Sequence, residues 1–343
     1  MIFPLYLGIP TTFSKSSPYF SCYNTPMNTP ITIGISACLT GMKVRYDGGH
    51  TRDPFLMETL ARFVELLPVC PEEECGLGVP REPMRLVGDT ARPRLVTIHT
   101  KTDLTERMES WCKKRVRELE TENLCGFIFK SRSPSSGMQR VKVYSESGGG
   151  IPQLKGVGLF ARASMEHFPL LPVEDEGRLH DPELRENFIT RIFVLRRWRE
   201  AAFQKRLGTL VDFHTRHKLL LLSHSEQHYR ALGRLVAQAR QYPEAELFAV
   251  YEQGLMTALG CKATPKKQVN VLLHLMGYFK KMLSPAEKQE LLDLIGQYQR
   301  EYVPLLVPLT LINHYVKKYG EEYLAGQYYL EPHPIELKLR NHV

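Results

Sequence analysis

The chain has 343 residues, of which 43% are hydrophobic and 24% charged, which is typical of a globular protein long enough for two domains. No run approaches the ~18 consecutive apolar residues of a transmembrane helix, so we expect no membrane-spanning segment. The net charge of +8 is uneven: residues 191–343 hold 22 Lys and Arg against 14 Asp and Glu, whereas residues 1–190 hold 23 of each. This excess favours a polyanionic partner for the C-terminal part, with plain solvation of helix faces as the alternative.

The N-terminal stretch is rich in proline and lacks the cationic segment of a signal peptide. Because Met27 stands just before the first predicted strand, we expect residues 1–30 to be a disordered or wrongly assigned extension. Seven cysteines without an export signal predict reduced thiols, available for metal binding or catalysis, in a cytoplasmic protein.

Residues 31–177 alternate between strand and helix signals. Short apolar runs predict strands at 31–38, 67–70, 94–99, 126–130 and 171–173, and periodic patterns predict helices at 53–66, 103–122 and 158–168. Residues 71–92 show little periodicity and are expected to form a long irregular loop, which is often functional. The alternation predicts an α/β domain with a Rossmann-like, mostly parallel sheet and helices on both faces.

Residues 178–325 are helical almost throughout and predict an all-α helical bundle domain, followed by a C-terminal tail at 326–343. Helix starts are marked by Asp181-Pro182, by Thr264-Pro265 and by a capping box at 284–287. Seven helices are expected near 183–206, 206–222, 225–241, 244–260, 265–283, 285–300 and 304–319.

The first of these helices carries clustered cations, and Arg196, Arg197 and Arg199 flank Trp198. Such a pattern suits phosphate contact and base stacking, and a solvated face that packs through the tryptophan is the alternative. Histidines at 214, 217, 224 and 228 have same-face helical spacing but no carboxylate that completes a ligand set. We therefore expect hydrogen-bonded or nucleic-acid-facing histidines rather than a zinc site.

Chemistry-bearing residues follow three of the predicted strands. Cys38 ends the first, Cys70 ends the second and is followed by Glu72 and Cys75, and a serine-rich turn at 133–137 follows the strand at 126–130. Because the carboxyl ends of parallel strands meet at one edge of a sheet, these loops are expected to share a pocket.

Five segments resemble the thiouracil desulfidase family: SACLTG at 36–41, RYDG at 45–48, VCPE at 69–72, GLGVPR at 76–81 and KSRSPS at 130–135. The C-terminal half, including LVDFHTRH at 210–217, is similar to the helical YbgA-like domain of unknown function. Their fusion resembles bacterial desulfidases that remove sulfur from 4-thiouridine in tRNA.

The resemblance implies a 4Fe–4S cluster held by three cysteines, with one iron left open as a Lewis acid. Cys38 and Cys70 match two of the ligands, whereas the third position is Ser136, a hard oxygen donor. Cys75 is the candidate stand-in, because it lies in the same loop as Cys70. The proton-transfer group would be Glu72 or Ser133.

The resemblance also implies a set of residues that contact the substrate or RNA: Arg45, Tyr46, Asp47, Arg81 and Arg132, in addition to the cations of the first bundle helix. The predicted function is iron–sulfur-dependent conversion of 4-thiouridine in tRNA to uridine and hydrosulfide by non-redox hydrolysis. The alternatives are desulfuration of free thiouracil-type bases and a non-catalytic tRNA- or protein-binding factor with a decayed cluster site. The expected partner is tRNA, with no DNA and no membrane.

Overall fold

A computed structural model describes residues 30–146 and 150–341, so the predicted N-terminal extension at 1–29 lies outside the described residues. By its internal contacts the chain divides into Met1–Pro30 and Ile31–Val343, and all the helices and strands below belong to the second unit. No helix in the described ranges is long and apolar enough to cross a membrane.

The first sheet is fully parallel and confirms the predicted fold class. Its strands run in the order β2-β1-β5-β8, with bounds β1 Thr32–Ser36, β2 Glu65–Val69, β5 Gly126–Phe129 and β8 Val173–Asp175. The four residues of β5 are all buried, as expected for a central strand covered on both faces.

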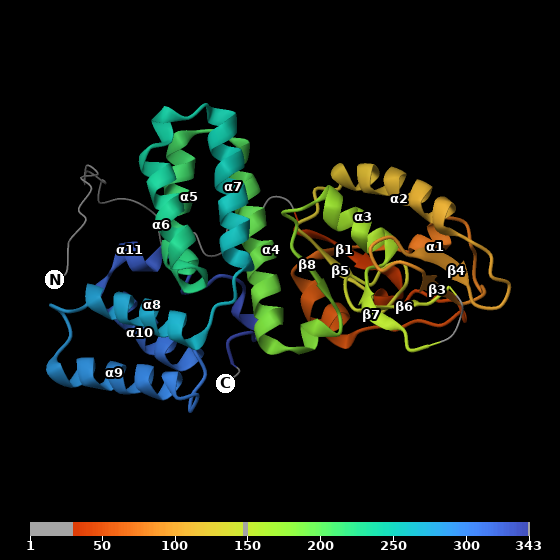
Figure 1. The fold of residues 1–343 in the computed structure, drawn as a ribbon. Helices are drawn as coiled ribbons and strands as arrows, with labels where there is room; N and C mark the ends of the chain where they lie inside the picture. Colours follow the sequence, from red (N-terminus) through yellow and green to blue (C-terminus); the bar gives the residue numbers. More distant parts are fainter. Residues whose placement is uncertain (1–29, 147–149, 342–343) are drawn as a thin grey trace. The chain divides into compact units, whose positions relative to one another are not determined.

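Helices cover both faces of this sheet (Figure 1). On one face, Phe127 and Phe129 pack with α2 (Thr105–Glu120) and α3 (Leu159–His167). On the other, Ile128 packs with the first bundle helix, α4 (Pro182–Phe203). Side chains alternate between the two faces of a strand, so one apolar segment supplies both cores.

A second, mixed sheet was not foreseen. Its strands are β3 (Met84–Val87), β4 (Arg94–Thr97), β6 (Val141–Tyr144) and β7 (Gln153–Gly156), in the order β4-β3-β6-β7. Only the β3–β6 pair is parallel, and both outer pairs are antiparallel. The prediction that 94–99 belongs to the parallel sheet is therefore wrong.

Two other local predictions also need correction. The expected irregular loop at 71–92 contains β3 and a one-turn helix, α1 (Pro71–Glu74). The expected helix at 53–66 is a π-helical turn at Phe55–Thr59 and a 3-10 turn at Leu60–Arg62, followed by β2. β2 begins earlier than the apolar pattern indicated, because Glu65 pairs with Thr32 of β1.

The C-terminal region has the seven predicted helices and one further short helix. Their bounds are α4 as above, α5 Leu207–His224, α6 Glu226–Ala237, α7 Glu244–Gly260, α8 Pro265–Tyr278, α9 Pro285–Gln299, α10 Leu306–Tyr319 and α11 Glu322–Ala325. The capping box is formed, since the Ser284 hydroxyl accepts from the Glu287 amide and the Glu287 carboxylate accepts from the Ser284 amide.

The segment treated as a C-terminal tail packs against the rest of the unit. Tyr329 is fully buried, and its hydroxyl donates to Gln268 Oε1 at 2.7 Å. Arg340 is also buried and donates to a carboxylate oxygen of Glu186 at 2.9 Å. The last described residues thus contribute to the core.

Candidate active site

The loops after β1, β2 and β5 meet at the carboxyl edge of the parallel sheet, as the topology predicted. They enclose a cavity of about 1220 Å³ whose lining includes Cys38, Cys70, Glu72, Ser133 and Ser136. Residues separated by up to about 100 positions in the sequence therefore share one site, because parallel strands end at the same edge.

Both cavity thiols are protonated near neutral pH. Burial raises the pKa of Cys70 to about 12, and the nearby charge of Glu72 adds to the effect. Burial also raises the pKa of Cys38, although the charge of Lys130 opposes the shift. Desolvation outweighs the nearby charges of Lys130 and Arg81, so neither thiol has the lowered pKa of a nucleophilic cysteine, and their chemistry here is that of soft sulfur donors.

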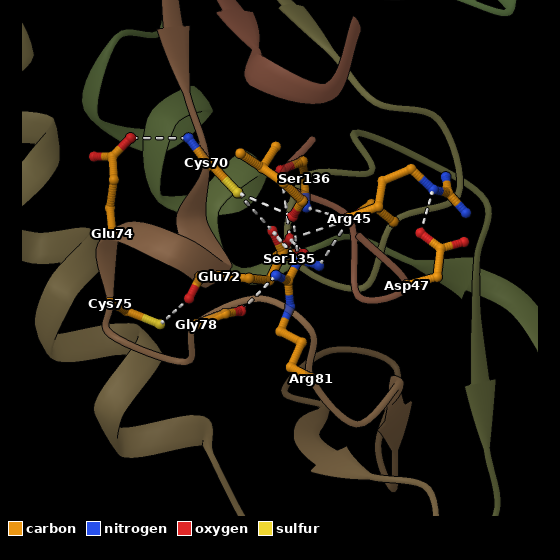
Figure 2. A network of polar contacts seen from close by, with 12 residues as sticks. Arg45, Asp47, Cys70, Glu72, Glu74, Cys75, Gly78, Arg81, Ser135 and Ser136 are labelled. Atoms are coloured by element: carbon orange, nitrogen blue, oxygen red, sulfur yellow. Dashed lines mark hydrogen bonds and ion pairs between the residues drawn. The ribbon is translucent and has the colours of Figure 1, made fainter. Parts of the chain in front are cut away.

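Glu72 is the centre of the polar network in the cavity (Figure 2). One carboxylate oxygen accepts from the Ser135 hydroxyl, and the other lies 3.6 Å from the Cys70 sulfur. The same carboxylate lies 3.7 Å from the Arg81 guanidinium, and both side chains are largely buried. Arg81 also donates to the main-chain oxygen of Val44 at 2.9 Å, so it ties the loop after β1 to Glu72.

In the serine-rich turn, the serine that contacts Glu72 is not the predicted Ser133. The Ser133 hydroxyl accepts from the amide of Ser136 at 3.1 Å and lies 3.0 Å from the Ser135 hydroxyl. Ser133 therefore shapes the turn, and Ser135 contacts Glu72 directly. Sequence reasoning missed Ser135, since the SPSS pattern does not distinguish one hydroxyl from the next.

Close packing fixes the position of this turn. A Cβ added to Gly158, just before α3, would lie 2.5 Å from the carbonyl group of Ser135. The first amides of α3 donate to the same carbonyl, from Phe160 at 2.9 Å and Ala161 at 3.2 Å. The turn is thus held by the start of α3, and Ser136 is 3% exposed at the wall of the cavity.

The residues present do not fit the three-thiolate cluster that the resemblance implies. Cys38 and Cys70 supply two soft donors, and the third candidate, Ser136, supplies a hard hydroxyl oxygen. Across residues 30–146 and 150–341, no group of three or more His, Cys, Asp or Glu side chains is arranged to hold a metal ion.

Cys75 does not take the third place. Its thiol donates to the main-chain oxygen of Glu72 at 3.4 Å, as Figure 2 shows, and its side chain packs against the hydrophobic core beneath α1 rather than lining the cavity. We therefore do not retain Cys75 as a stand-in ligand.

Positive charge also gathers around the cavity, although residues 1–190 carry no net charge as a whole. Eight cationic side chains line it, together with the acidic Glu72 and Asp175; the eight are Arg45, Arg81, Arg85, Lys130, Arg132, Arg140, Lys142 and Arg178. Clefts lined by one sign of charge concentrate oppositely charged ligands. The cavity is therefore suited to an anionic ligand.

The loop after β1 supplies two further residues of the predicted substrate set. Tyr46 is 43% exposed at the cavity wall, and the Arg45 guanidinium lies 5.6 Å from the centre of its ring. Asp47 lies outside the cavity lining; it accepts from the Gly49 amide at 3.0 Å and lies 3.5 Å from Arg45. Asp47 thus shapes the loop, whereas Arg45 and Tyr46 face the ligand space.

Arg196, Arg197 and Arg199, which were expected to bind RNA, all have partners within the protein, and their contact with RNA stays a prediction. Arg196 is buried and paired with Glu200 at 2.8 Å. Arg197 stacks on a tyrosine ring at 3.9 Å, and desolvation lowers its pKa to about 10. Arg199 donates to the main-chain oxygen of Leu124 at 2.7 Å, and Trp198 is buried in the core.

Three bundle histidines are buried and hydrogen-bonded. His214 Nδ1 lies 3.0 Å from the Tyr251 hydroxyl. His217 Nδ1 lies 2.7 Å from the carbonyl oxygen of Phe213, and His224 Nδ1 lies 2.8 Å from that of Cys261. Burial lowers the pKa of His214 and of His224 to about 4. These groups are neutral structural residues rather than metal ligands.

The fold and the site define an open α/β domain that binds its ligand at the carboxyl edge of a parallel sheet, joined to a helical region. Residues 33–176 match the family model described as 2-thiouracil desulfurase, and residues 218–334 match the model of a protein family of unknown function, DUF1722. The uncharacterized protein YbgA of Escherichia coli K12 is 39% identical over 135 residues, which cover 39% of this chain and 80% of that protein. The chain belongs to this YbgA-like family and carries a 2-thiouracil desulfurase domain ahead of the YbgA-like region.

Two other proteins are similar to the α/β domain. The uncharacterized protein YbbK of Bacillus subtilis 168 is 29% identical over 111 residues, which cover 30% of this chain and 71% of that protein. The solved structure of a [4Fe-4S]-dependent thiouracil desulfidase, TudS, is 28% identical, covers 45% of this chain and 95% of that chain, and has a TM-score of 0.37.

Proposed function

We propose that the α/β domain is a desulfidase that converts 4-thiouridine in tRNA to uridine and hydrosulfide by hydrolysis, without net redox change, in the cytoplasm. The observation that carries the proposal is the cavity itself, which is lined by Glu72, two soft sulfur donors and eight cations, with Ser135 buried behind the wall as the hydrogen-bond donor to Glu72. The match to the 2-thiouracil desulfurase model supports the reaction class.

Charge and volume favour a nucleic-acid substrate over a free base. Thiouracil is small and uncharged at neutral pH, whereas the cavity measures about 1220 Å³ and is lined by eight cations. Cavities for drug-sized ligands measure roughly 300–1,000 Å³, so there is room for a nucleotide with its flanking phosphates. Free thiouracil remains the second candidate, because the family model carries its name.

The hydrolysis balances with water as the only co-reactant. The water oxygen forms a bond to the thiocarbonyl carbon, the carbon–sulfur bond breaks, and sulfur leaves as hydrosulfide. The Glu72 carboxylate would take one proton from the water and pass it to the departing sulfur, and the second water proton would be released to solvent as the carbonyl forms. The Ser135 hydroxyl, which donates to Glu72, would keep the carboxylate oriented. The Arg81 guanidinium lies 3.7 Å from the carboxylate and would hold it in place beside the substrate. No step is assigned to an iron–sulfur cluster, because the donor set lacks a third thiolate.

Bulk tRNA that contains 4-thiouridine provides the test. The full-length protein should convert 4-thiouridine to uridine and release an equal amount of hydrosulfide, measured by nucleoside mass spectrometry and a sulfide assay. Glu72→Gln should abolish most of the turnover, whereas Glu73→Gln, at the exposed neighbouring carboxylate, should not. Turnover of free thiouracil but not of tRNA would replace the proposal with the second candidate.

A further inference from the structure

Five of the eight cavity cations are already engaged by the protein. Four are paired with carboxylates and one with an aromatic ring: Arg45 with Asp47, Arg81 with Glu72, Lys130 with Glu176, Arg178 with Glu174, and Arg85 with Tyr144. Within the described ranges, Arg132, Arg140 and Lys142 have no ion pair, hydrogen bond or ring partner, and all three are exposed. We call these three residues the cationic rim.

The three rim residues lie on the chain segment 132–142, which contains the serine-rich turn at the cavity. Arg132 follows β5 and precedes the serine-rich turn, and Arg140 follows that turn and precedes β6. In β6, Val141 and Val143 are buried while Lys142 is exposed, because alternate side chains of a strand point to opposite faces. The rim cations therefore flank the turn that holds Ser135 and Ser136.

Two rim residues have an unusual backbone conformation. Arg132 has φ of 60° and Arg140 has φ of 54°, in the left-handed region where a glycine or asparagine is more stable than a long side chain. Backbone strain of this kind is concentrated at binding and catalytic sites. At both positions this conformation fixes the direction in which the arginine leaves the turn.

We propose that the cationic rim binds phosphates of the RNA backbone on either side of the nucleotide that enters the cavity. The two arginines present planar forks that match phosphate oxygens, and Lys142 adds a point charge. The rim thus replaces α4 as the RNA-contacting surface. The inference rests on the proposed function for the identity of that nucleotide, and on the structure for the phosphate contacts.

Binding of the full-length protein to tRNA without 4-thiouridine isolates the rim from catalysis. The test variant is Arg132→Gln/Arg140→Gln/Lys142→Gln, and the matched control removes three other exposed cations through Lys113→Gln/Arg117→Gln/Lys281→Gln. Each phosphate contact contributes about 0.7 to the slope of log affinity against log salt for single strands, so the rim variant should lose up to about 2 from that slope. The control should keep most of it.

Equal affinities and slopes for the rim variant and the control would overturn the proposal. A rim variant that keeps tRNA binding but loses binding to poly-glutamate would also overturn it, in favour of an acidic protein partner. Thermal unfolding checks that the triple variant is folded. If the triple variant does not fold, Lys142→Gln alone replaces it in the binding experiment, because that change leaves the backbone at 132 and 140 unchanged. Turnover of free 4-thiouridine by the wild-type protein reports on the proposed function separately from tRNA binding.

Discussion

Ser136→Cys tests the mismatch between the cavity and the cluster that the resemblance implies. Among the described residues, the side chain that hydrogen-bonds to the Ser136 hydroxyl is that of Ser135. The two hydroxyl oxygens are 3.4 Å apart, so the hydrogen bond is long. Losing it should cost about 1 kcal/mol or less, and the larger sulfur atom faces a roomy cavity rather than a packed core. The variant should therefore fold with nearly unchanged stability.

The expected gain is iron binding. With three thiols at the cavity wall, anaerobic reconstitution should give about four iron atoms per chain and an iron–sulfur absorption band, because soft thiolates are the preferred cluster ligands. The wild-type protein and Ser136→Ala, which removes the hydroxyl without adding sulfur, should bind clearly less. If Ser136→Cys holds no more iron than Ser136→Ala, the assignment of position 136 as the third ligand site is refuted.

Three other predictions follow from contacts in the site and in the helical region. Glu72→Gln should lower turnover by about 10²–10⁴, the range for loss of a general base, while Glu73→Gln stays near wild type in the same tRNA assay. His214 is neutral in the folded state with a pKa of about 4, so the protein should lose stability as the pH falls from about 6.5 towards 4. Thermal unfolding at pH 7.5 and 5.5 measures this loss, and His214→Gln should make it smaller. An unchanged difference in stability between the two pH values would contradict the prediction. Arg197→Met should destabilise the protein by about 1–3 kcal/mol, because stacking on Tyr328 and a hydrogen bond to the main chain are lost, and tRNA affinity should not change. A stable variant with weaker tRNA binding would indicate that α4 contacts RNA after all.

The part of the site that the sequence predicts is the part fixed by parallel topology. Strands β1, β2 and β5 are recognisable at least in part from their apolar runs, and their shared edge brings Cys38, Cys70 and Glu72 together. The second sheet was missed because short apolar runs do not identify their pairing partners. β3 lies inside an aperiodic stretch, and its parallel partner β6 is separated from it by more than 50 residues.

Charge patterns were the least reliable guide to the site. Arg196, Arg197 and Arg199 form a dense basic cluster, yet each binds a partner within the protein. The partner of Arg197, Tyr328, is about 130 positions away, so local sequence gives no sign of the contact. Arg132, Arg140 and Lys142, which are more widely spaced in the sequence, are the cations left exposed and unpaired at the cavity within the described residues.

The most direct measurement of the central claim is the fate of 4-thiouridine in tRNA incubated with the full-length protein. The account predicts that 4-thiouridine is lost, that uridine and hydrosulfide appear in equal amounts, and that Glu72→Gln abolishes most of the conversion while Glu73→Gln does not. Unchanged 4-thiouridine with the wild-type protein, or equal conversion by Glu72→Gln, would contradict it.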